Sequence, residues 1–294
     1  MVEVREGVSL KGFNTWRVGG VAEFFAEVFC EKELFSAIAF AKEAGLKLTI
    51  LGGGSNVLVS DGTVDGLVVK NNLTSILWQN DLVIVDSGYS LAALVRLLEQ
   101  QLWCDMVFAS GIPGSVGGAV KGNAGAFGGD IASHIEWTEV IRNGDIKRVP
   151  KRDCRFLYRK SGFFKNDIIL RVAIRKSKCS AFDMTQKRQE FATKRRANQP
   201  GGHNAGSVFK NPIITSTTSA LLNNKSAGAL IEAVGLKGHT IGGAQISTKH
   251  ANFIINLGSA TAQDIKKLIT LCKKEVKNKF GVELLEEVVR IGGN

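Results

Sequence analysis

The chain has 294 residues, of which 44% are hydrophobic and 22% charged, and its formal net charge is +11 at pH 7. This length exceeds one ordinary hydrophobic core and predicts two or three domains, and the composition is typical of a folded soluble protein. No apolar run approaches the ~18 residues that span a bilayer, and the N-terminal residues lack the basic and apolar regions of a signal peptide. We therefore expect a cytoplasmic globular protein without a membrane segment.

The first part of the chain alternates between strand and helix patterns. We expect strands at 21–29, within 46–56, at 66–71 and at 81–88, and helices at 31–45 and 90–103. Ser90 is placed to cap the second helix, and Gly45 to end the first. The strand within 46–56 runs into a turn of three glycines, Gly52 to Gly54.

The second part continues in the same mixed way. We expect strands that end with one at 167–177, a polar helix at 181–197, a helix at 225–238, a strand at 250–258, a helix at 261–281 and a closing strand at 282–292. Thr261 and Asp264 have the spacing of a helix start. Strands and helices mix throughout, so the predicted fold class is α+β. The Gln-Pro-Gly-Gly run at 199–202 is the predicted domain boundary.

The cysteines and histidines do not indicate disulfide bonds or a metal site. The five cysteines are Cys30, Cys104, Cys154, Cys179 and Cys272, and no two of them form a C-x-x-C pair. This odd, scattered set argues against a disulfide framework and against a structural zinc site, so we expect no metal.

Positive charge gathers at Lys187–Arg196 and at Lys266–Lys279. The second cluster interleaves with apolar residues such as Ile265 and Leu268, which predicts the solvent face of an amphipathic helix. Either nucleic acid or an anionic small ligand would account for the net charge. The chain has no RNP, helix-turn-helix or zinc pattern, so a nucleic-acid-binding protein is kept only as the alternative from a different class.

Two glycine-rich stretches are the strongest local signals. Gly52-Gly53-Gly54-Ser55-Asn56 follows a predicted strand, and it reads equally well as a phosphate loop or as a sharp turn that needs positive φ. In residues 111–131, eight residues are glycine and only Lys121 is basic. The apolar residues inside the second stretch argue against a flexible linker. Backbone N–H groups can bind a pyrophosphate without charged side chains, so the two stretches suit a long ligand with a diphosphate in its middle.

Neither stretch matches a common nucleotide signature. No Gly-Lys pair exists in the chain, which excludes a Walker A loop, and no G-x-G-x-x-G occurs, which disfavours a dinucleotide fold of the Rossmann type.

A series of motifs gives a more specific indication. In chain order they are NTWRVGG (14–20), LGGGSNVLVSD (51–61), GIPGSVGGAVKGNAGAFG (111–128), YRKSGF (158–163), NAGSVFKNP (204–212), LIEAVGLKGHTIGGAQIS (230–247), KHANFIIN (249–256) and EEVVRIG (286–292). Together, from about residue 9 to 292, they resemble the UDP-N-acetylenolpyruvoylglucosamine reductase family. Members of that family are flavoenzymes that make UDP-N-acetylmuramate for peptidoglycan.

The resemblance implies a fold of the vanillyl-alcohol oxidase type that holds FAD, plus a C-terminal substrate-binding domain. The expected division is 1–66 and 67–200 for two FAD-binding subdomains and 201–294 for the substrate domain, with the last strand free to return to the first subdomain. The expected FAD-binding residues are Gly52, Gly53, Gly54, Ser55, Asn56, Ile112, Pro113, Gly114, Ser115, Gly118, Asn123, Ala124 and Gly125.

The resemblance also implies the substrate and its contacts. The partners would be a UDP-sugar and NADPH, with no nucleic acid and no membrane, and the chain would be a monomer. Tyr158, Lys210 and Asn211 match positions that touch the substrate. The chain is similar to the shorter class of the family, which lacks an inserted loop bearing a tyrosine for the substrate diphosphate. The candidates for that phosphate are then Lys194, Arg195, Arg196 and Lys210.

Three residues would carry the chemistry. Arg159 matches the family position that stabilises an enolate, and Ser207 matches the proton donor. The third member is an acid near the C-terminus, where Glu286 and Glu287 compete. Counting back from Ile291 selects Glu287, and strand alternation would put Glu287 on a buried face with Leu285 and Val289. Another FAD-dependent oxidoreductase of the same fold is the alternative function.

Overall fold

The computed structural model describes residues 2–103, 105–176, 181–212 and 225–293. They group into two compact units. Unit 1 comprises Met1–Glu6, Phe24–Gly53 and Gly66–Ala197, and unit 2 comprises Gly7–Glu23, Gly54–Asp65 and Asn198–Asn294. The expected division into three consecutive domains stays a prediction. Cys104 and Cys179 lie outside the described residues, and the other three cysteines are free thiols.

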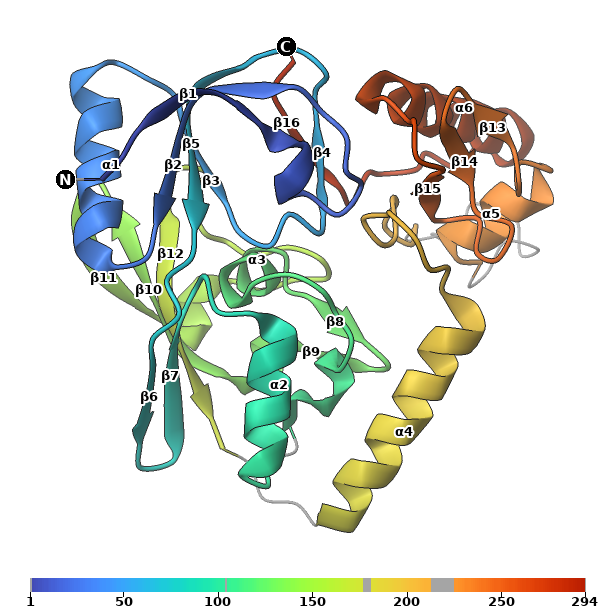
Figure 1. Cartoon of the computed structure of the whole chain (residues 1–294). Coiled ribbons are helices and arrows are strands. Elements are labelled where there is room, and N and C mark those ends of the chain that lie inside the picture. Colours follow the sequence, from blue (N-terminus) through green and yellow to red (C-terminus); the bar gives the residue numbers. More distant parts are fainter. Residues whose placement is uncertain (1, 104, 177–180, 213–224, 294) are drawn as a thin grey trace. The chain divides into compact units, whose positions relative to one another are not determined.

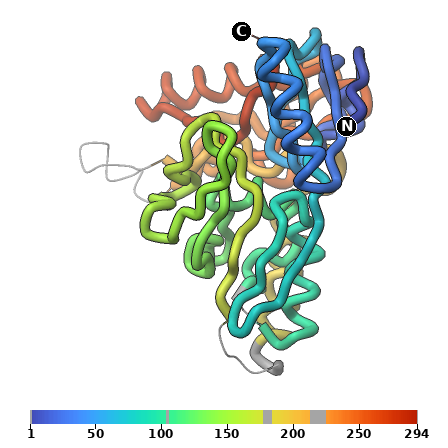
Figure 2. Tube along the Cα trace, turned by 90° about the vertical axis from the view of Figure 1, so that its left-hand side faces the viewer, coloured from blue at the N-terminus to red at the C-terminus, as the bar shows by residue number. Residues whose placement is uncertain are grey.

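A four-stranded sheet is built by the N-terminal part of the chain. Its order is β1-β2-β5-β3, and its strands are β1 (Arg5–Ser9), β2 (Val21–Val28), β5 (Val64–Asn71) and β3 (Leu48–Leu51). Helix α1 (Glu31–Glu43) lies along β2 and β5, as both views show (Figures 1 and 2). It buries Leu34, Ala37 and Ala41 there, which confirms the expected apolar face of this helix.

A five-stranded antiparallel sheet forms the rest of the framework of unit 1. Its order is β11-β10-β12-β7-β6, with β6 (Ile76–Gln79), β7 (Leu82–Asp86), β10 (Ile135–Arg142), β11 (Asp145–Pro150) and β12 (Ile168–Arg175). Helix α2 (Leu91–Gln100) begins at the expected cap, since the Ser90 side chain accepts a hydrogen bond from the Ala93 amide. Helices α2 and α3 (Val116–Lys121) share one hydrophobic core with β7 and β12.

The glycine-rich stretch is more ordered than a loop. It contains α3 and a small hairpin of β8 (Gly125–Ala126) and β9 (Gly129–Asp130). Val116 and Val120 are fully buried or nearly so. This burial confirms that the stretch is packed and is not a linker. The short 3-10 helices are Leu10–Phe13, Asp105–Ala109, Ile131–His134 and Lys151–Cys154.

The expected polar helix is α4 (Ala181–Asn198), after which the chain enters unit 2. There the elements are α5 (Ala227–Ala233), β13 (Thr240–Ile241), β14 (Ala244–Ile246), β15 (Ile254–Asn256) and α6 (Ala262–Phe280). Helix α6 packs on β13 and β14 (Figure 1). Its capping box of Thr261 and Asp264 is present as expected, and its basic residues lie opposite a buried apolar face.

The C-terminal segment corrects one expectation. Strand β16 (Val289–Ile291) pairs in parallel with β4 (Val57–Val59), but the predicted buried face is wrong. Leu285 and Val289 are 63% and 57% exposed, whereas Leu284 and Val288 are buried. Residues before 289 are not a regular strand, and Val282, Leu284 and Val288 pack into the core beside α6, which leaves Leu285 and Val289 exposed, whereas Ile291 is buried. None of the described helices is long and apolar enough to cross a membrane.

Candidate active site

The two glycine-rich stretches meet in unit 1 through bare backbone. Gly52 and Gly53 follow β3. A Cβ atom added to Gly53 would lie 2.5 Å from the Cα atom of Gly114, and one added to Gly52 would lie 2.3 Å from the Ser115 Oγ atom. Any larger residue at position 53 would push the two stretches apart, because the atom that it meets belongs to the main chain. The close approach therefore requires glycine at this point.

This meeting point offers amide groups to a ligand. Among the described residues, the amides of Gly52, Gly53, Gly114 and Ser115 donate no hydrogen bond to protein groups. Backbone donors that no protein group uses are what a diphosphate needs. The residues present therefore fit the diphosphate of a dinucleotide such as FAD.

The first turn of α3 offers fewer free N–H donors to an anion than a helix N-terminus usually does. The amides of Val116 and Gly117 donate to the carbonyl oxygens of Tyr89 and Ser87, at 2.9 and 2.8 Å, and the Gly118 amide donates to Ser115 Oγ at 3.3 Å. These donors are already satisfied inside the protein. The amides that remain for an anion lie before the helix.

The end of the first glycine turn belongs to unit 2. The Gly54 carbonyl accepts a hydrogen bond of 3.0 Å from the Thr15 amide. Asn56 donates through Nδ2 to the carbonyl oxygen of Glu287 at 3.0 Å, and its own carbonyl accepts from the Val289 amide at 3.0 Å. Asn56 is thus tied to the segment that carries the candidate acid.

Asn123 joins three segments of unit 1. It is 4% exposed, and it has a left-handed backbone with φ 43°. Its side chain donates to the Leu157 carbonyl at 3.0 Å and accepts from the Ala132 amide at 3.1 Å. Ile112 and Ala124 are partly buried, and they pack against the core that α2 and α3 share with β7 and β12. In this structure Asn123 holds the loop that carries Arg159.

Arg159 sits at the tip of a tight turn. The main chains of Leu157 and Lys160 exchange two hydrogen bonds, of 2.9 and 3.1 Å, around Tyr158 and Arg159. Arg159 has φ 52°, and its Nη2 atom donates to the Gly125 carbonyl at 2.7 Å. Its guanidinium carbon lies 5.4 Å from the Tyr158 ring centre. The structure therefore brings Tyr158, Arg159 and Gly125 together.

Unit 2 brings the candidate proton donor and the candidate acid onto paired segments. Phe209 and Glu286 form an antiparallel bridge, in which the Glu287 amide donates to the Val208 carbonyl at 2.8 Å and the Lys210 amide to the Leu285 carbonyl at 2.9 Å. Ser207 and Glu287 therefore lie at the same end of one short pairing. Asn211 accepts a hydrogen bond of 3.1 Å from the Ala227 amide, at the start of α5.

Glu286 and Glu287 differ in what surrounds them. The Glu286 carboxylate accepts hydrogen bonds from Lys273 Nζ at 2.6 Å and from Arg290 Nε and Nη2, both at 2.9 Å. Burial raises the pKa of Glu286, but the hydrogen bonds from Arg290 and Lys273 outweigh it, so the net pKa is lowered. Glu286 is a structural ion-pair partner, which leaves the half-buried Glu287 as the better candidate acid.

Sequence reasoning missed two supporting residues. The Asn252 side chain accepts from the Phe209 amide at 2.9 Å and donates to the Phe209 carbonyl at 2.8 Å, and so fixes the main chain near Ser207. Lys70 donates to the Gly52 carbonyl at 2.6 Å. The available signals were Asn252 between the apolar residues Ala251 and Phe253, and Lys70 directly after the apolar run Leu67–Val69, because a polar group beside buried apolar residues needs a partner.

The candidates for the substrate phosphate are not equivalent. Arg195 packs on the glycine-rich stretch, with its guanidinium carbon 5.0 Å from the Phe127 ring centre and its Cδ atom next to Gly111. Burial lowers the pKa of Arg195. Lys194 pairs instead with Glu190, one turn earlier on α4.

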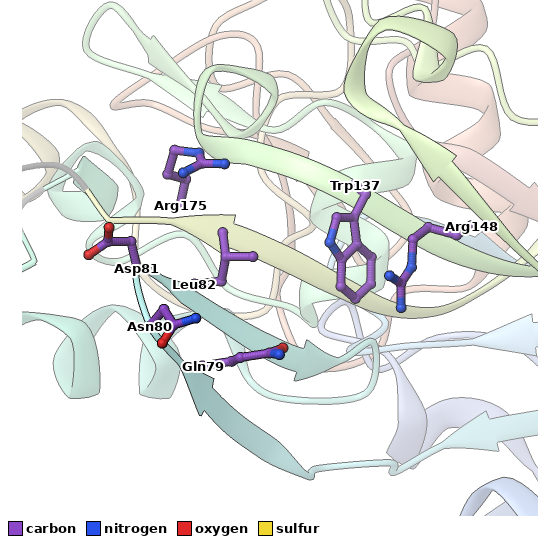
Figure 3. A pocket seen from close by; sticks show the side chains of 7 residues that line it. All are labelled: Gln79, Asn80, Asp81, Leu82, Trp137, Arg148 and Arg175. Atoms are coloured by element: carbon purple, nitrogen blue, oxygen red, sulfur yellow. The ribbon is translucent and has the colours of Figure 1, made fainter.

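A cavity of about 380 Å³ lies elsewhere in unit 1. It is lined by Gln79, Asn80, Asp81, Leu82, Trp137, Arg148 and Arg175 (Figure 3). None of the expected site residues lines it. Its two arginines already pair with acids, Arg148 with Glu139 at 2.7 Å and Arg175 with Glu136 at 2.8 Å. Neither the glycine-rich stretches of unit 1 nor the 207 and 287 segments of unit 2 take part in this cavity.

Two family models match the chain. Residues 22–149 match the FAD binding domain, and residues 197–291 match the UDP-N-acetylenolpyruvoylglucosamine reductase, C-terminal domain. The first match includes Gly52, Gly53, Gly114 and Ser115, whose main chains form what we call the glycine cradle. The second match includes Ser207 and Glu287.

Named relatives match over nearly the whole chain. UDP-N-acetylenolpyruvoylglucosamine reductase of Rubrobacter xylanophilus is 34% identical, over 96% of this chain and 93% of its own length. The enzyme of the same name from Chlamydia felis is 39% identical, over 97% of this chain and 93% of its own length. The crystal structure of UDP-N-acetylenolpyruvylglucosamine reductase from Thermus caldophilus is similar with a TM-score of 0.83 and 31% identity, and the match covers 99% of both chains.

Proposed function

This chain belongs to the UDP-N-acetylenolpyruvoylglucosamine reductase family, and we propose that it reduces UDP-N-acetylglucosamine enolpyruvate to UDP-N-acetylmuramate, a peptidoglycan precursor, with FAD as cofactor and NADPH as hydride donor. The observation that carries the cofactor assignment is the bare-backbone contact between Gly53 and Gly114 in the region that matches the FAD binding domain.

The amides of Gly52, Gly53, Gly114 and Ser115 would hold the diphosphate of FAD. The expected contacts from Gly54, Ser55, Asn56, Ile112, Pro113, Gly118, Asn123, Ala124 and Gly125 remain part of this proposal. Bound FAD would supply the hydride-carrying chemistry between NADPH and the enolpyruvyl group.

Arg159 would stabilise the negative charge that develops on the enolpyruvyl carboxylate. A guanidinium stays protonated at all working pH values and can bind both oxygens of a carboxylate. The tight turn from Leu157 to Lys160 and the hydrogen bond to Gly125 restrict the movement of Arg159. A charge held in place costs little reorganisation when the negative charge forms, and this supports a catalytic role.

Ser207 would donate the proton that completes the reduction, and Glu287 would manage charge or protons beside it. A serine hydroxyl is a weak acid, so the strongly basic enolate must make the transfer favourable. The short pairing of the 208 and 287 segments supports a joint role, because it gives the two residues a shared main-chain support. Tyr158, Lys210 and Asn211 are proposed to contact the substrate, and Arg195, Arg196, Lys194 or Lys210 its diphosphate.

Our proposal extends to the location, oligomeric state and domain division of the enzyme. We propose that the enzyme is a cytoplasmic monomer that binds neither nucleic acid nor membrane, since NADPH and UDP-sugars are soluble anionic nucleotides that account for the +11 net charge. We also propose two FAD-binding subdomains, 1–66 and 67–200, and a substrate domain, 201–294.

A turnover assay tests the function. Purified protein should oxidise NADPH only when the UDP-enolpyruvyl sugar is present, and mass spectrometry should find UDP-N-acetylmuramate in equal amount. NADPH oxidation with oxygen or a small alcohol or aldehyde, but without conversion of the UDP-sugar, would instead favour another FAD-dependent oxidoreductase.

A further inference from the structure

The glycine turn after β3 is held from behind by a lysine on the neighbouring strand. Lys70 lies near the end of β5, in parallel register with Leu51. Its half-buried amine donates to the carbonyl oxygen of Gly52 at 2.6 Å. The residues on either side, Val69 and Asn71, are buried. Burial lowers the pKa of Lys70, and the charge of Glu27 partly opposes this effect.

The contact controls the direction of one amide. The peptide between Gly52 and Gly53 is trans, so its N–H group points away from the carbonyl that Lys70 holds. Among the described residues, the Gly53 amide donates to no protein group. A cation on a carbonyl oxygen also polarises the peptide and strengthens the N–H on its far side as a donor. Lys70 thus both orients and strengthens a donor of the cradle.

The next residue, Asn71, is linked by hydrogen bonds to the second glycine stretch. Asn71 Nδ2 donates to Ser87 Oγ at 2.8 Å, and the Ser87 carbonyl accepts from the Gly117 amide at 2.8 Å. A Cβ atom on Gly117 would lie 2.7 Å from the Ser87 Cβ atom, so the two main chains are in close contact. Adjacent residues of β5 therefore anchor both stretches, Lys70 directly and Asn71 through Ser87.

We propose that Lys70 is a positioning residue for the FAD diphosphate, which fixes the Gly52–Gly53 peptide and places a positive charge one peptide behind the amides that face the anion. The proposal rests on the FAD-dependent function proposed above. It explains how stretches with so little charge of their own hold a dianionic group. The one basic residue of the second stretch, Lys121, donates to the Phe164 carbonyl at 2.8 Å, on a different loop.

Titration of flavin-free protein with FAD and with riboflavin tests the proposal. Lys70→Met should weaken FAD binding about 10- to 100-fold, as expected for loss of a hydrogen bond from a charged group. Riboflavin lacks phosphates, so its affinity should not change. Lys70→Arg keeps the charge and the donor and should recover most of the FAD affinity. Lys47→Met is the matched control, because Lys47 is exposed just before β3 and should leave FAD binding unchanged.

The binding measurements distinguish the role of Lys70 from the use of FAD by the protein. Wild-type protein that binds no FAD would overturn the proposed function itself. Wild-type affinity for FAD in Lys70→Met, or an equal loss for FAD and riboflavin, would overturn the role of Lys70 alone. If Lys70→Met does not fold, Lys70→Gln replaces it, since glutamine still donates a hydrogen bond but carries no charge. Lys70→Gln should bind FAD more weakly than Lys70→Arg does, and equal affinities would overturn the part assigned to charge.

Discussion

Ser207 stands in a segment whose main chain is held on both sides of it. Gly206 has φ 75° and donates to the Asn204 side chain at 2.9 Å, and Val208 donates to the Asn252 carbonyl at 2.8 Å. Ser207→Ala removes only the hydroxyl, so we expect NADPH to reduce the flavin at a near-normal rate. Reoxidation by the enolpyruvyl substrate should slow by about 10²–10⁴-fold, the usual cost of losing a positioned acid.

Stopped-flow measurement of the two half-reactions checks this prediction. Cysteine at position 207 should restore part of the second half-reaction, because a thiol also donates a proton. Equal slowing of both half-reactions would show instead that Ser207 holds structure or ligand. No slowing of either would place the proton donor elsewhere.

Glu286 and Glu287 are adjacent but have different surroundings, so replacing each by glutamine should affect the catalytic rate differently. We expect Glu287→Gln to slow substrate reduction by about 10²–10⁴-fold with little change in melting temperature. Glu286→Gln should keep nearly normal chemistry, because its carboxylate is engaged with Lys273 and Arg290. Steady-state rates with the UDP-enolpyruvyl sugar provide the comparison, and the reverse ranking would show that the acid is Glu286.

The same ion pairs predict a pH dependence of stability. The net pKa of Glu286 is lowered in the folded protein from an ordinary value of 4.5, so its contribution is present above about pH 4.5 and is lost as the pH falls towards the folded pKa. We expect Glu286→Gln to unfold about 1–3 kcal/mol more easily at neutral pH. The difference from wild type should shrink in acid, and thermal unfolding at a series of pH values measures it. A difference that stays constant into acid would contradict this assignment.

At the scale of elements, the meeting of two glycine stretches is the feature most open to a test. In Gly53→Ala, the new methyl group would lie 2.5 Å from the Gly114 Cα atom, so the two backbones must separate. We expect FAD to bind about 10-fold or more weakly, since overpacking of this kind costs ~1–3 kcal/mol. Gly62→Ala is the control, because nothing lies within 4 Å of a Cβ atom there. Unchanged FAD affinity in Gly53→Ala would show that the contact is not part of the cradle.

Most elements follow from local patterns, and the exceptions have physical causes. The helices α1, α2 and α6 have apolar faces of helical period and a signal at one end or both, so their positions are predictable. Helix α3 has the sequence VGGAVK, and glycine is a poor helix former, so its stability must come from the burial of Val116 and Val120. Alternation failed before β16 because that segment is not a regular strand.

At the scale of the whole molecule, the order of the motifs predicted the family and the candidate site residues, but not the residues that hold them in place. The family expectation is confirmed by relatives that match nearly the full chain, whereas the roles of the single site residues stay predictions. Lys70 and Asn252 act through residues far from them in sequence, on Gly52 and on Phe209. Such contacts depend on strand register and chain topology, which a single sequence does not specify.

The central claim is that one flavin takes hydride from NADPH and gives it to the UDP-enolpyruvyl sugar. The most direct measurement is the visible spectrum of the purified protein without oxygen, during the addition of one reagent and then the other. We expect bound FAD whose absorbance is bleached by NADPH and restored by the UDP-enolpyruvyl sugar, with one UDP-N-acetylmuramate formed for each flavin reoxidised. A protein that binds no flavin, or a bleached flavin that the UDP-enolpyruvyl sugar leaves reduced, would contradict it.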